Sequence, residues 1–208
     1  MTVTLVDLEA ASAEEVIAYA VEHFGASLKT ACSFQKEESV LAHMLSLLAP
    51  DARLFTIDTG VLFPETLRTW KLFEERWPAL QIEVVDASNP AGAWTRENCC
   101  GTAKVDGLNT ALADASAWIT GIRREQADTR AGALKFELDE KRGIAKFNPL
   151  ADWSEKDIWT YIFKHDLPYN PLHDQGYESI GCAPCTLPGS GRDGRWAGED
   201  KTECGIHV

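Results

Sequence analysis

The sequence is short of basic residues and lacks any long apolar run. Its 208 residues include 20 Lys and Arg against 32 Asp and Glu, which gives a formal net charge of −12. Because nucleic-acid binding needs a broad basic face, this balance argues against a nucleic-acid partner. No stretch approaches membrane-spanning length, and no apolar run follows a positive N-terminal region. We therefore expect a cytoplasmic enzyme without membrane attachment, whose basic residues are confined to a local pocket.

The sequence also lacks a clean linker and an internal repeat beyond a strand–helix alternation. With 208 residues, 45% of them hydrophobic, it has enough apolar content for one full core. After Pro188 the chain becomes rich in glycine and charge, which is typical of a mobile segment. We therefore assign residues 1–188 to one α/β domain and residues 189–208 to a mobile C-terminal segment.

Strand-like and helix-like segments alternate along most of the chain. Apolar periodicity predicts helices at residues 1–26, with a capping box at Ser12, and at residues 40–48 and 64–77. Short apolar runs predict strands at residues 28–32, 53–57, 81–85 and 117–122. Residues 134–147 are more polar and predict an exposed connection with some β character. This alternation implies a parallel sheet with helices on both faces and ligands beyond the carboxyl ends of its strands.

Three polar segments directly follow predicted strands. They are residues 33–39, 58–60 and 121–126. A strand, a polar loop and a helix in this order aim backbone N–H groups and the positive helix end at an anion, although an ordinary βα turn has the same pattern. Because the carboxyl ends of parallel strands share one edge of a sheet, we expect the three segments to converge there.

Four of the six cysteines form two pairs, Cys99-Cys100 and Cys182-x-x-Cys185. In the cytoplasm such thiols are metal ligands or reactive groups more often than disulfides. An iron–sulfur cluster is favoured, because adjacent thiolates can reach different irons. Structural zinc sites use two CxxC knuckles, and a redox dithiol follows a strand and opens a helix, so both fit less well but stay open. Cys32 at a strand end is expected to be a buried, small apolar residue.

Cys204 stands outside the two pairs, in the glycine- and charge-rich tail. Lys201 and His207 are close to it in sequence, and positive neighbours favour the thiolate. A nucleophile on a mobile segment can meet a substrate and then a second protein. The alternative is a tail cysteine without a function.

Taken together, the motifs resemble those of the assimilatory adenylyl-sulfate (APS) reductases. The resemblance spans nearly the whole chain and is carried by residues 33–39 (SFQKEES), 57–60 (IDTG), Cys99-Cys100 with Lys104, 121–126 (GIRREQ), Cys182-x-x-Cys185 and 201–207 (KTECGIH). It implies an adenine-nucleotide α-hydrolase-like fold related to the ATP pyrophosphatases. It also implies reduction of adenosine 5′-phosphosulfate to sulfite and AMP, in sulfate assimilation and cysteine biosynthesis, with electrons from thioredoxin or a glutaredoxin-like donor.

The resemblance also implies roles for particular residues. Cys204 would be the nucleophile that forms an S-sulfocysteine intermediate, and Ser33 and Ser39 would cradle the anion. One [4Fe–4S] cluster per chain would be held by Cys99, Cys100, Cys182 and Cys185. The cations that hold phosphate, sulfate and thiolate together would be Lys104, Arg123, Arg130, Arg192, Arg195 and His207.

Three other functions compete with this one. A 3′-phosphoadenylyl-sulfate (PAPS) reductase, or an enzyme that uses both substrates, has the same fold and nucleophile but generally lacks the two cysteine pairs. A tRNA-thiolating ATP pyrophosphatase would need a Ser-Gly-Gly-x-Asp-Ser loop and a basic surface, and residues 33–39 differ from that loop. A non-enzymatic iron–sulfur electron carrier would need neither the anion loops nor Cys204. A homo-oligomer is compatible with all of these.

Overall fold

In a computed structural model of the chain, the described residues are 7–88, 95, 98–196 and 203. They form a six-stranded sheet in the order β3-β2-β1-β4-β6-β5. Every neighbouring pair is parallel except β5–β6, which is antiparallel. The strands are β1 (Leu28–Ala31), β2 (Arg53–Asp58), β3 (Gln81–Asp86), β4 (Ala117–Ile119), β5 (Phe136–Asp139) and β6 (Ile144–Phe147).

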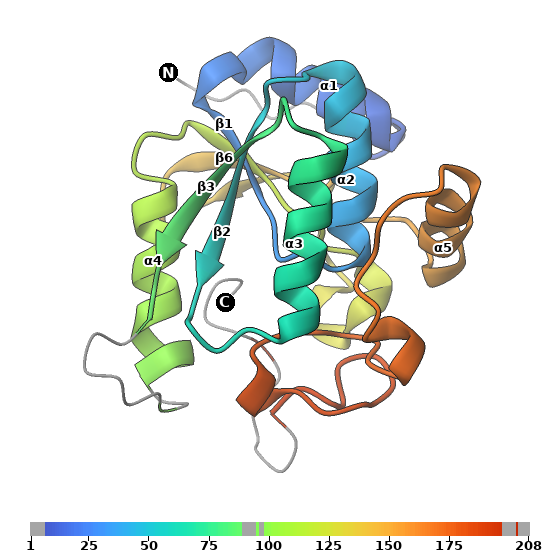
Figure 1. The fold of residues 1–208 in the computed structure, drawn as a ribbon. Helices are drawn as coiled ribbons and strands as arrows, with labels where there is room; N and C mark the ends of the chain where they lie inside the picture. The colour runs from blue at the N-terminus through green and yellow to red at the C-terminus, as the bar shows by residue number, and fades with distance from the viewer. Residues whose placement is uncertain (1–6, 89–94, 96–97, 197–202, 204–208) are drawn as a thin grey trace.

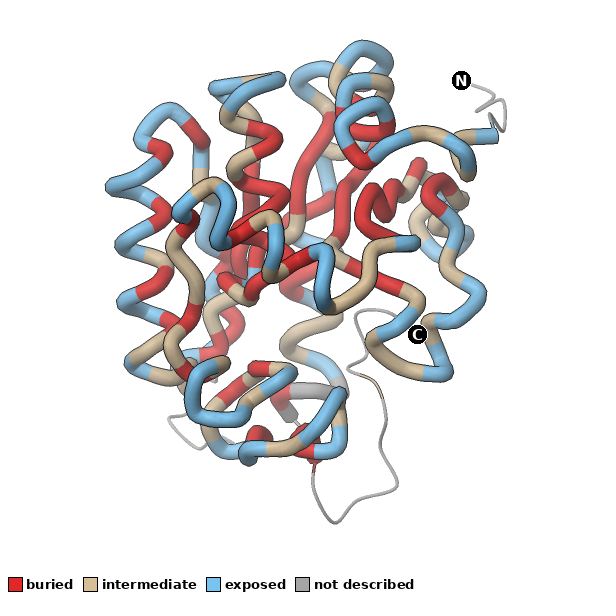
Figure 2. Tube along the Cα trace, turned by 90° about the vertical axis from the view of Figure 1, so that its right-hand side faces the viewer, coloured by how far each residue is buried: buried red, intermediate tan, exposed pale blue. Residues whose placement is uncertain are grey.

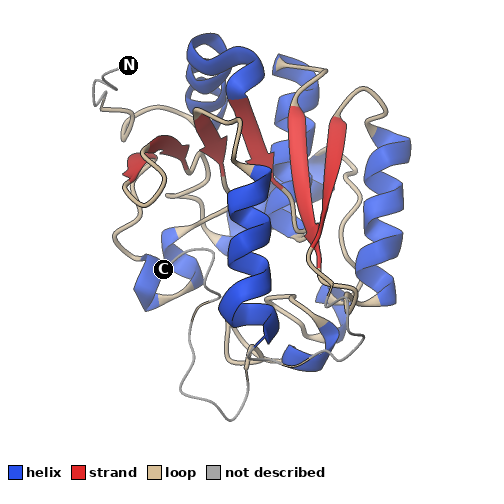
Figure 3. Cartoon of the chain, turned by 90° about the vertical axis from the view of Figure 1, so that its left-hand side faces the viewer, coloured by secondary structure: helices blue, strands red, loops and turns tan. Residues whose placement is uncertain are grey.

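Helices cover both faces of this sheet (Figures 1 and 3). They are α1 (Ala13–Phe24), α2 (Lys36–Leu48), α3 (Pro64–Arg76), α4 (Lys104–Ala111) and α5 (Glu155–Lys164). Short helical turns occur at Gly25–Ser27, Asn98–Ala103, Arg124–Gln126, Asp128–Arg130, His173–Gln175 and Ala183–Cys185. The predicted parallel α/β sheet is therefore confirmed. Within the described part of the chain, no helix is long and apolar enough to cross a membrane.

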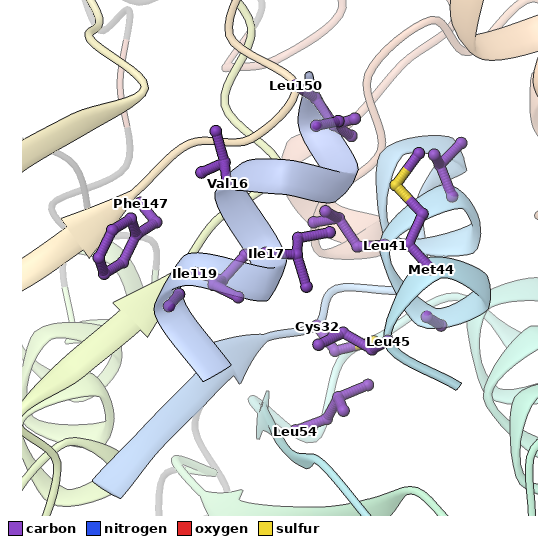
Figure 4. Close-up of a cluster of buried hydrophobic side chains, with 14 of the residues drawn as sticks. Val16, Ile17, Cys32, Leu41, Met44, Leu45, Leu54, Ile119, Phe147 and Leu150 are labelled. Carbon is purple, nitrogen blue, oxygen red and sulfur yellow. The ribbon is translucent and has the colours of Figure 1, made fainter. Parts of the chain in front are cut away.

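The core is divided by the sheet into two clusters, because successive side chains of a strand point to opposite faces. On β2, Leu54 packs with α1, α2 and α3, whereas Phe55 packs with α4. Figure 4 shows the larger cluster, with Ile17 of α1 and Leu41 of α2 lying over the strands. Burying each such side chain contributes about 1.5–3 kcal/mol. Figure 2 shows buried positions concentrated in the strands and on the inner faces of the helices.

The prediction for residues 134–147 is confirmed in its β character and wrong in its exposure. This segment holds β5 and β6, and β6 joins the sheet beside β4 in parallel register. Ala145 and Phe147 are fully buried, while Lys146 on the opposite face lies over the Trp118 ring and pairs with Glu137 at 2.7 Å. A four-residue strand with a lysine in it has too little apolar character to be recognised in the sequence.

The first two helices also differ from their predicted bounds. α1 begins at Ala13, and its capping box at Ser12 is present as predicted, but residues 7–12 precede the helix. α2 begins at Lys36 rather than at residue 40, because Gln35 and Glu38 form a capping box one turn earlier. The polar segment 33–39 is therefore half loop and half first helical turn.

Residues 189–196 pack against the segment before them, which differs from the mobility predicted after Pro188. Leu187 donates its N–H to the carbonyl of Gly194 at 2.8 Å, and Trp196 donates to that of Cys185 at 3.0 Å. Trp196 is 2% exposed. This part of the predicted C-terminal segment thus belongs structurally to the α/β domain. Residues 197–202 and 204–208, which include Cys204 and His207, lie outside the described residues.

Candidate functional site

A cavity of about 410 Å³ opens at the carboxyl edge of the sheet. Its wall contains residues 31–38 after β1, 55–57 of β2 and 120–123 after β4, together with the distant segments 178–181 and 190–192. In Figure 1 the red part of the chain, which follows α5, lies below the carboxyl ends of β2 and β3. The volume is in the range of small-molecule sites. Two of the three predicted polar segments thus contribute to one cavity.

The third segment, residues 58–60, has another neighbour. It does not contribute to the cavity wall among the described residues. Instead, the Thr59 hydroxyl lies 3.2 Å from Sγ of Cys182. Residues at the carboxyl ends of neighbouring strands therefore line the cavity in one place and contact the cysteines in another.

The loop after β1 is held in a strained conformation by aromatic packing. Phe34 has φ = +59°, is fully buried, and stacks on Trp70 with ring centres 5.3 Å apart. Non-glycine residues with such φ values are rare and cluster at functional sites. Packing of this ring turns Ser33 and Gln35 toward the cavity, where Gln35 also accepts a hydrogen bond from the N–H of Ile180 at 2.7 Å. Sequence analysis missed Phe34, since no pattern signals positive φ.

The two predicted serines differ in position. Ser33 lies in the cavity wall and donates its hydroxyl to Glu38 at 2.9 Å. Ser39 is fully buried inside α2, donates to the carbonyl of Gln35 at 3.4 Å, and does not contribute to the described cavity wall. The early start of α2 is what turns Ser39 inward.

Glu38 is a buried acid in the wall of the cavity. Its burial, with the neighbouring charge of Glu37, raises its pKa to about 7, although hydrogen bonds from Ser33 and the Gln35 N–H oppose the shift. Burial, with the charge of Glu38, also raises the pKa of Cys32 well above its usual value. Cys32 is 4% exposed and remains a thiol, which confirms it as a buried small residue. Gly121 packs so close to Glu37 and Glu38 that a Cβ atom there would overlap both side chains.

Arg123 lies in the cavity wall but is paired with carboxylates. Its guanidinium donates to Glu37 at 3.0 Å and to Glu155 at 2.6 Å, and the residue is 2% exposed. Burial would raise the pKa of Glu37, but the charges of Lys36 and Arg123 outweigh it and lower that pKa. Arg123 therefore ties α2, the loop after β4 and α5 together at the edge of the cavity.

Lys36 is a cation that sequence analysis missed. It is 3% exposed, lies in the cavity wall, pairs with Glu155 at 3.0 Å and donates to the carbonyl of Glu178 at 2.7 Å. In the sequence, its position in the polar segment after β1 was the feature that could have indicated a role at the site. The sequence shows no partner for it, because both of its partners are distant along the chain.

The remaining described cations of the prediction, Lys104, Arg130, Arg192 and Arg195, also contribute to the cavity wall. Arg195 donates to the carbonyl of Ile180 at 3.2 Å, and its guanidinium lies 4.5 Å from the centre of the Trp196 ring. It crosses so close to Gly181 that a Cβ atom there would overlap the guanidinium. Arg130 and Arg192 both bind the carboxylate of Glu203, at 2.8 and 2.9 Å.

Three of the predicted metal ligands lie together beside the cavity. Cys99, Cys182 and Cys185 form one buried cluster with Trp196. A hydrogen bond with Cys99, followed by the charge of Lys104, lowers the pKa of Cys182 to about 5 despite burial. The side chain of Cys100 lies outside the described residues, and among those that are described no three His, Cys, Asp or Glu side chains are arranged to hold a metal ion.

The cysteine segments are positioned by short contacts between loops. Ala183 donates its N–H to the carbonyl of Val61 at 2.9 Å, and Cys182 forms an isolated bridge with Leu62. Cys99 is carried by the helical turn Asn98–Ala103, which leads into α4. As predicted, the CxxC follows a loop rather than a strand, and it opens no α-helix, because its own residues Ala183–Cys185 form a single short turn that ends at the extended Thr186. This setting is unlike that of a redox dithiol.

Comparison with known proteins gives a consistent set of matches. Residues 27–188 match the model of the phosphoadenosine phosphosulfate reductase domain. An adenosine 5′-phosphosulfate reductase of Geobacillus kaustophilus is 42% identical, with 97% of this chain and 92% of that protein covered. A phosphoadenosine 5′-phosphosulfate reductase of Gloeobacter violaceus is 43% identical, with 94% and 88% covered. The crystal structure of phosphoadenylyl-sulfate reductase from Candida auris, a phosphate complex, superposes with a TM-score of 0.71 at 26% identity and covers 90% of this chain and 100% of that one.

Proposed function

Because the chain belongs to the phosphoadenosine phosphosulfate reductase family, we propose that it reduces adenosine 5′-phosphosulfate to sulfite and AMP. The family and the fold class predicted from the sequence are confirmed by the same matches. The choice of adenosine 5′-phosphosulfate follows the name of the Geobacillus relative and the two cysteine pairs of this chain.

The observation that carries this proposal is the gathering of cations around one cavity in an acidic protein. Five predicted basic residues contribute to the cavity wall although the whole chain has a net charge of −12. They are Lys104, Arg123, Arg130, Arg192 and Arg195. A substrate with phosphate and sulfate groups needs such fixed cations, which are strongest where protein surrounds them.

The two sides of the cavity suit the two halves of the substrate. Phe55, Ile57 and Leu108 provide an apolar wall on the β2 and α4 side, where a nucleoside can pack. Lys36, Ser33 and the arginines lie around the rest. We place the sulfate end on that polar side, next to residues 190–192.

The chemistry assigned to Cys204 proceeds in two displacements. Its thiolate attacks the sulfate sulfur, an S–S bond forms, and the bond from sulfur to the phosphate oxygen breaks so that AMP leaves with the electron pair. A thiolate of thioredoxin, or of a glutaredoxin-like donor, then attacks Sγ of Cys204, and sulfite leaves with the S–S electron pair. The second donor thiol resolves the mixed disulfide and restores Cys204. The two electrons thus come from the donor dithiol.

We further propose that Cys99, Cys100, Cys182 and Cys185 hold one [4Fe–4S] cluster per chain. The donor type fits, because thiolates are the ligands of such clusters and three of these thiols are buried together, although their side chains do not converge on one metal position among the described residues. When bound, such a cluster would fix the turn that carries Cys99 and add its charge beside the cavity. Lys104 is the residue that connects the two regions, since it contacts Cys182 and also contributes to the cavity wall.

The proposal is tested by one turnover without a reductant. Anaerobic protein mixed with adenosine 5′-phosphosulfate should release AMP in an amount equal to the protein. The peptide that contains Cys204 should gain about 80 Da, the mass of a sulfite-derived adduct. AMP release without an adduct, or an adduct on another cysteine, would contradict the assignment. Iron and sulfide analysis of the same sample tests the cluster, and zinc in a colourless protein would refute it.

Reduction of 3′-phosphoadenylyl sulfate is the second candidate function, because the relative from Gloeobacter violaceus carries that name at 43% identity. The two substrates differ by a single phosphate on the ribose. Measuring kcat/KM for both with the same thioredoxin supply distinguishes them. We expect the value for adenosine 5′-phosphosulfate to be larger, and equal values would indicate an enzyme that uses both.

A further inference from the structure

The side chain of Gln35 connects the loop after β1 to residues 178–181, which lie far along the chain. Its Oε1 accepts the backbone N–H of Ile180 at 2.7 Å, across a sequence separation of 145 residues. Its Nε2 donates to the hydroxyl of Ser33 at 3.1 Å. Both ends of the amide group are therefore used, which fixes the orientation of the side chain. Ser33, Gln35 and Ile180 all contribute to the cavity wall.

Two successive residues of the chain hold the segment 178–181 in this way. Directly after Gln35, Lys36 donates its Nζ to the carbonyl of Glu178 at 2.7 Å. Directly before it, Phe34 is fully buried with φ = +59°, and this conformation sets the direction in which the chain leaves β1. The contacts of Gln35 therefore depend on a loop whose backbone is fixed by packing.

Arg195 contacts the same segment. Its Nη1 donates to the carbonyl of Ile180 at 3.2 Å and to the hydroxyl of Ser179 at 3.3 Å. Its guanidinium also packs against Gly181, where a Cβ atom would overlap it. Arg195 is 9% exposed and contributes to the cavity wall. The place of this guanidinium in the wall therefore depends on where residues 179–181 lie.

Ile180 is the residue through which Gln35 and Arg195 are linked. Its N–H is bound by Gln35 and its carbonyl by Arg195, and the residue is 3% exposed. A buried N–H that loses its acceptor is costly, so loss of the Gln35 oxygen favours a shift of this segment toward water. Such a shift also moves the carbonyl that orients Arg195.

We propose that Gln35 is a positioning residue, which holds residues 179–181 and thereby sets the place of the Arg195 guanidinium for the terminal anionic group of the nucleotide. The ligand of Arg195 rests on the proposed function, but the hydrogen-bonded link from Gln35 to Ile180 does not. Gln35 thus acts on the anion through another residue, although it lies in the same polar segment as Ser33.

The link is tested by hydrogen exchange in the full chain, read from overlapping peptides that contain Ile180. Gln35→Met keeps the length of the side chain and removes both polar groups. We expect the Ile180 amide to exchange at least about tenfold faster in this variant, because its acceptor is lost. Gln35→Glu keeps an oxygen acceptor and should keep the exchange slow.

A matched control is the same replacement at an exposed glutamine, Gln175→Met, which should leave the exchange of Ile180 at the wild-type rate. Unchanged exchange in Gln35→Met, or an equal increase in Gln175→Met, would refute the link.

Nucleotide binding then reports the position of Arg195. Adenosine 5′-diphosphate carries a phosphate where the proposed substrate carries its sulfate, whereas AMP ends one group earlier. The ratio of the Kd for AMP to the Kd for adenosine 5′-diphosphate, measured by isothermal titration calorimetry, therefore reports binding of the terminal anion. We expect Arg195→Met to lower this ratio about tenfold and Gln35→Met about fivefold. A general loss of structure would weaken both nucleotides alike and leave the ratio unchanged, which would refute the proposal.

The double variant decides whether Gln35 acts through Arg195. If it does, Gln35→Met adds nothing once Arg195 is methionine, and the double variant has the ratio of Arg195→Met alone. If the two effects instead multiply, to about fiftyfold, the residues act independently and the proposal is refuted. Wild-type protein that binds neither nucleotide would refute the proposed function, whereas the exchange of Ile180 would still decide whether Gln35 holds the segment.

Discussion

Lys29 and Arg123 are both buried cations at ends of the central strands, and they differ in what surrounds them. Lys29 lies near the amino end of β1 and binds Glu83 at 2.9 Å, Asp114 at 2.7 Å and the carbonyl of Ala111 at 2.6 Å. Arg123 lies beyond the carboxyl end of β4, in the wall of the cavity. Buried charge alone therefore does not mark a functional site. Its meaning depends on which edge of the parallel sheet it occupies.

The partners of the two cations differ in solvent exposure. The side chains of Glu83 and Asp114 are 45% and 59% exposed, so water can replace Lys29. Two partners of Arg123, Glu155 and Glu125, are likewise 41% and 57% exposed, but its third partner, Glu37, is 5% exposed and cannot be hydrated in the same way. The carboxyl edge of the sheet thus holds charged groups in buried positions, where desolvation costs free energy. Sites that use charge in binding or catalysis commonly have this property.

The largest effect is expected from the residue that we assign to the chemistry. Cys204→Ser replaces the nucleophile by a hydroxyl that stays protonated at neutral pH, so turnover should fall at least about 10³-fold. Bound iron and affinity for AMP should not change. Steady-state sulfite release, iron analysis and AMP titration measure the three quantities. Appreciable turnover by the variant would show that another thiol is the nucleophile.

Replacing each of the two buried cations by methionine tests the comparison directly. Arg123→Met leaves Glu37 buried without the charge of Arg123 and should lower the free energy of unfolding by about 3–4 kcal/mol. Lys29→Met leaves hydrated partners and should lower it by about 1–2 kcal/mol, with kcat/KM unchanged. Urea denaturation measures both.

Arg123→Lys is the variant to use if Arg123→Met does not fold. It keeps the charge but loses the planar guanidinium, so it should lower the free energy of unfolding by a smaller amount. If Arg123→Met and Lys29→Met lowered the free energy of unfolding equally, the carboxyl and amino edges of the sheet would not differ in how they hold a buried cation.

The architecture could be predicted from the sequence because it depends on local patterns. The apolar runs of β1 and β2, and the polar residues that follow β1 and β4, are visible within short windows. β6 could not be found, because its pairing with β4 and the contact of Lys146 with Glu137 join segments that only the fold brings together. A strand of four residues is recognised poorly in general, because the pairing that stabilises it involves residues outside its own short sequence.

The sequence predicted which residues lie at the site, but it did not predict which groups of the chain they contact. Arg123, Arg130 and Arg192 were expected to face the substrate, and all three contribute to the cavity wall, yet each also binds a carboxylate of the chain. Glu203 is distant from Arg130 in the sequence, so no spacing links them. Ser39 was assigned to the anion site by the family resemblance, and the sequence did not reveal that the first turn of α2 would bury it.

Glu38, a buried acid at the carboxyl edge, should destabilise the fold as the pH rises. The pKa of Glu38 is raised to about 7, chiefly by burial, with Glu37 and Cys32 as its charged or titratable neighbours. Because the folded state holds this proton more tightly than the unfolded chain, stability falls between about pH 4.5 and pH 7. Glu38→Gln removes the titration, so from pH 5 to pH 8 the wild type should lose about 1–3 kcal/mol more than the variant. Parallel pH profiles from urea denaturation would contradict this.

An acid at the amino edge should have the opposite and smallest effect. Hydrogen bonds from Lys29 and then Arg53 lower the pKa of Asp114 to about 2, so its contribution to stability is present above about pH 4 and is lost as the pH falls toward 2. Because the Asp114 side chain is 59% exposed, solvent screens the pair, and Asp114→Asn should cost no more than about 0.5–1 kcal/mol at pH 6. The difference between wild type and variant in urea denaturation should shrink from pH 6 to pH 3 and should be reduced in 1 M NaCl. A difference that grows on acidification would mean that Lys29 is held by Glu83 and the Ala111 carbonyl alone, and that the two edges handle their acids alike.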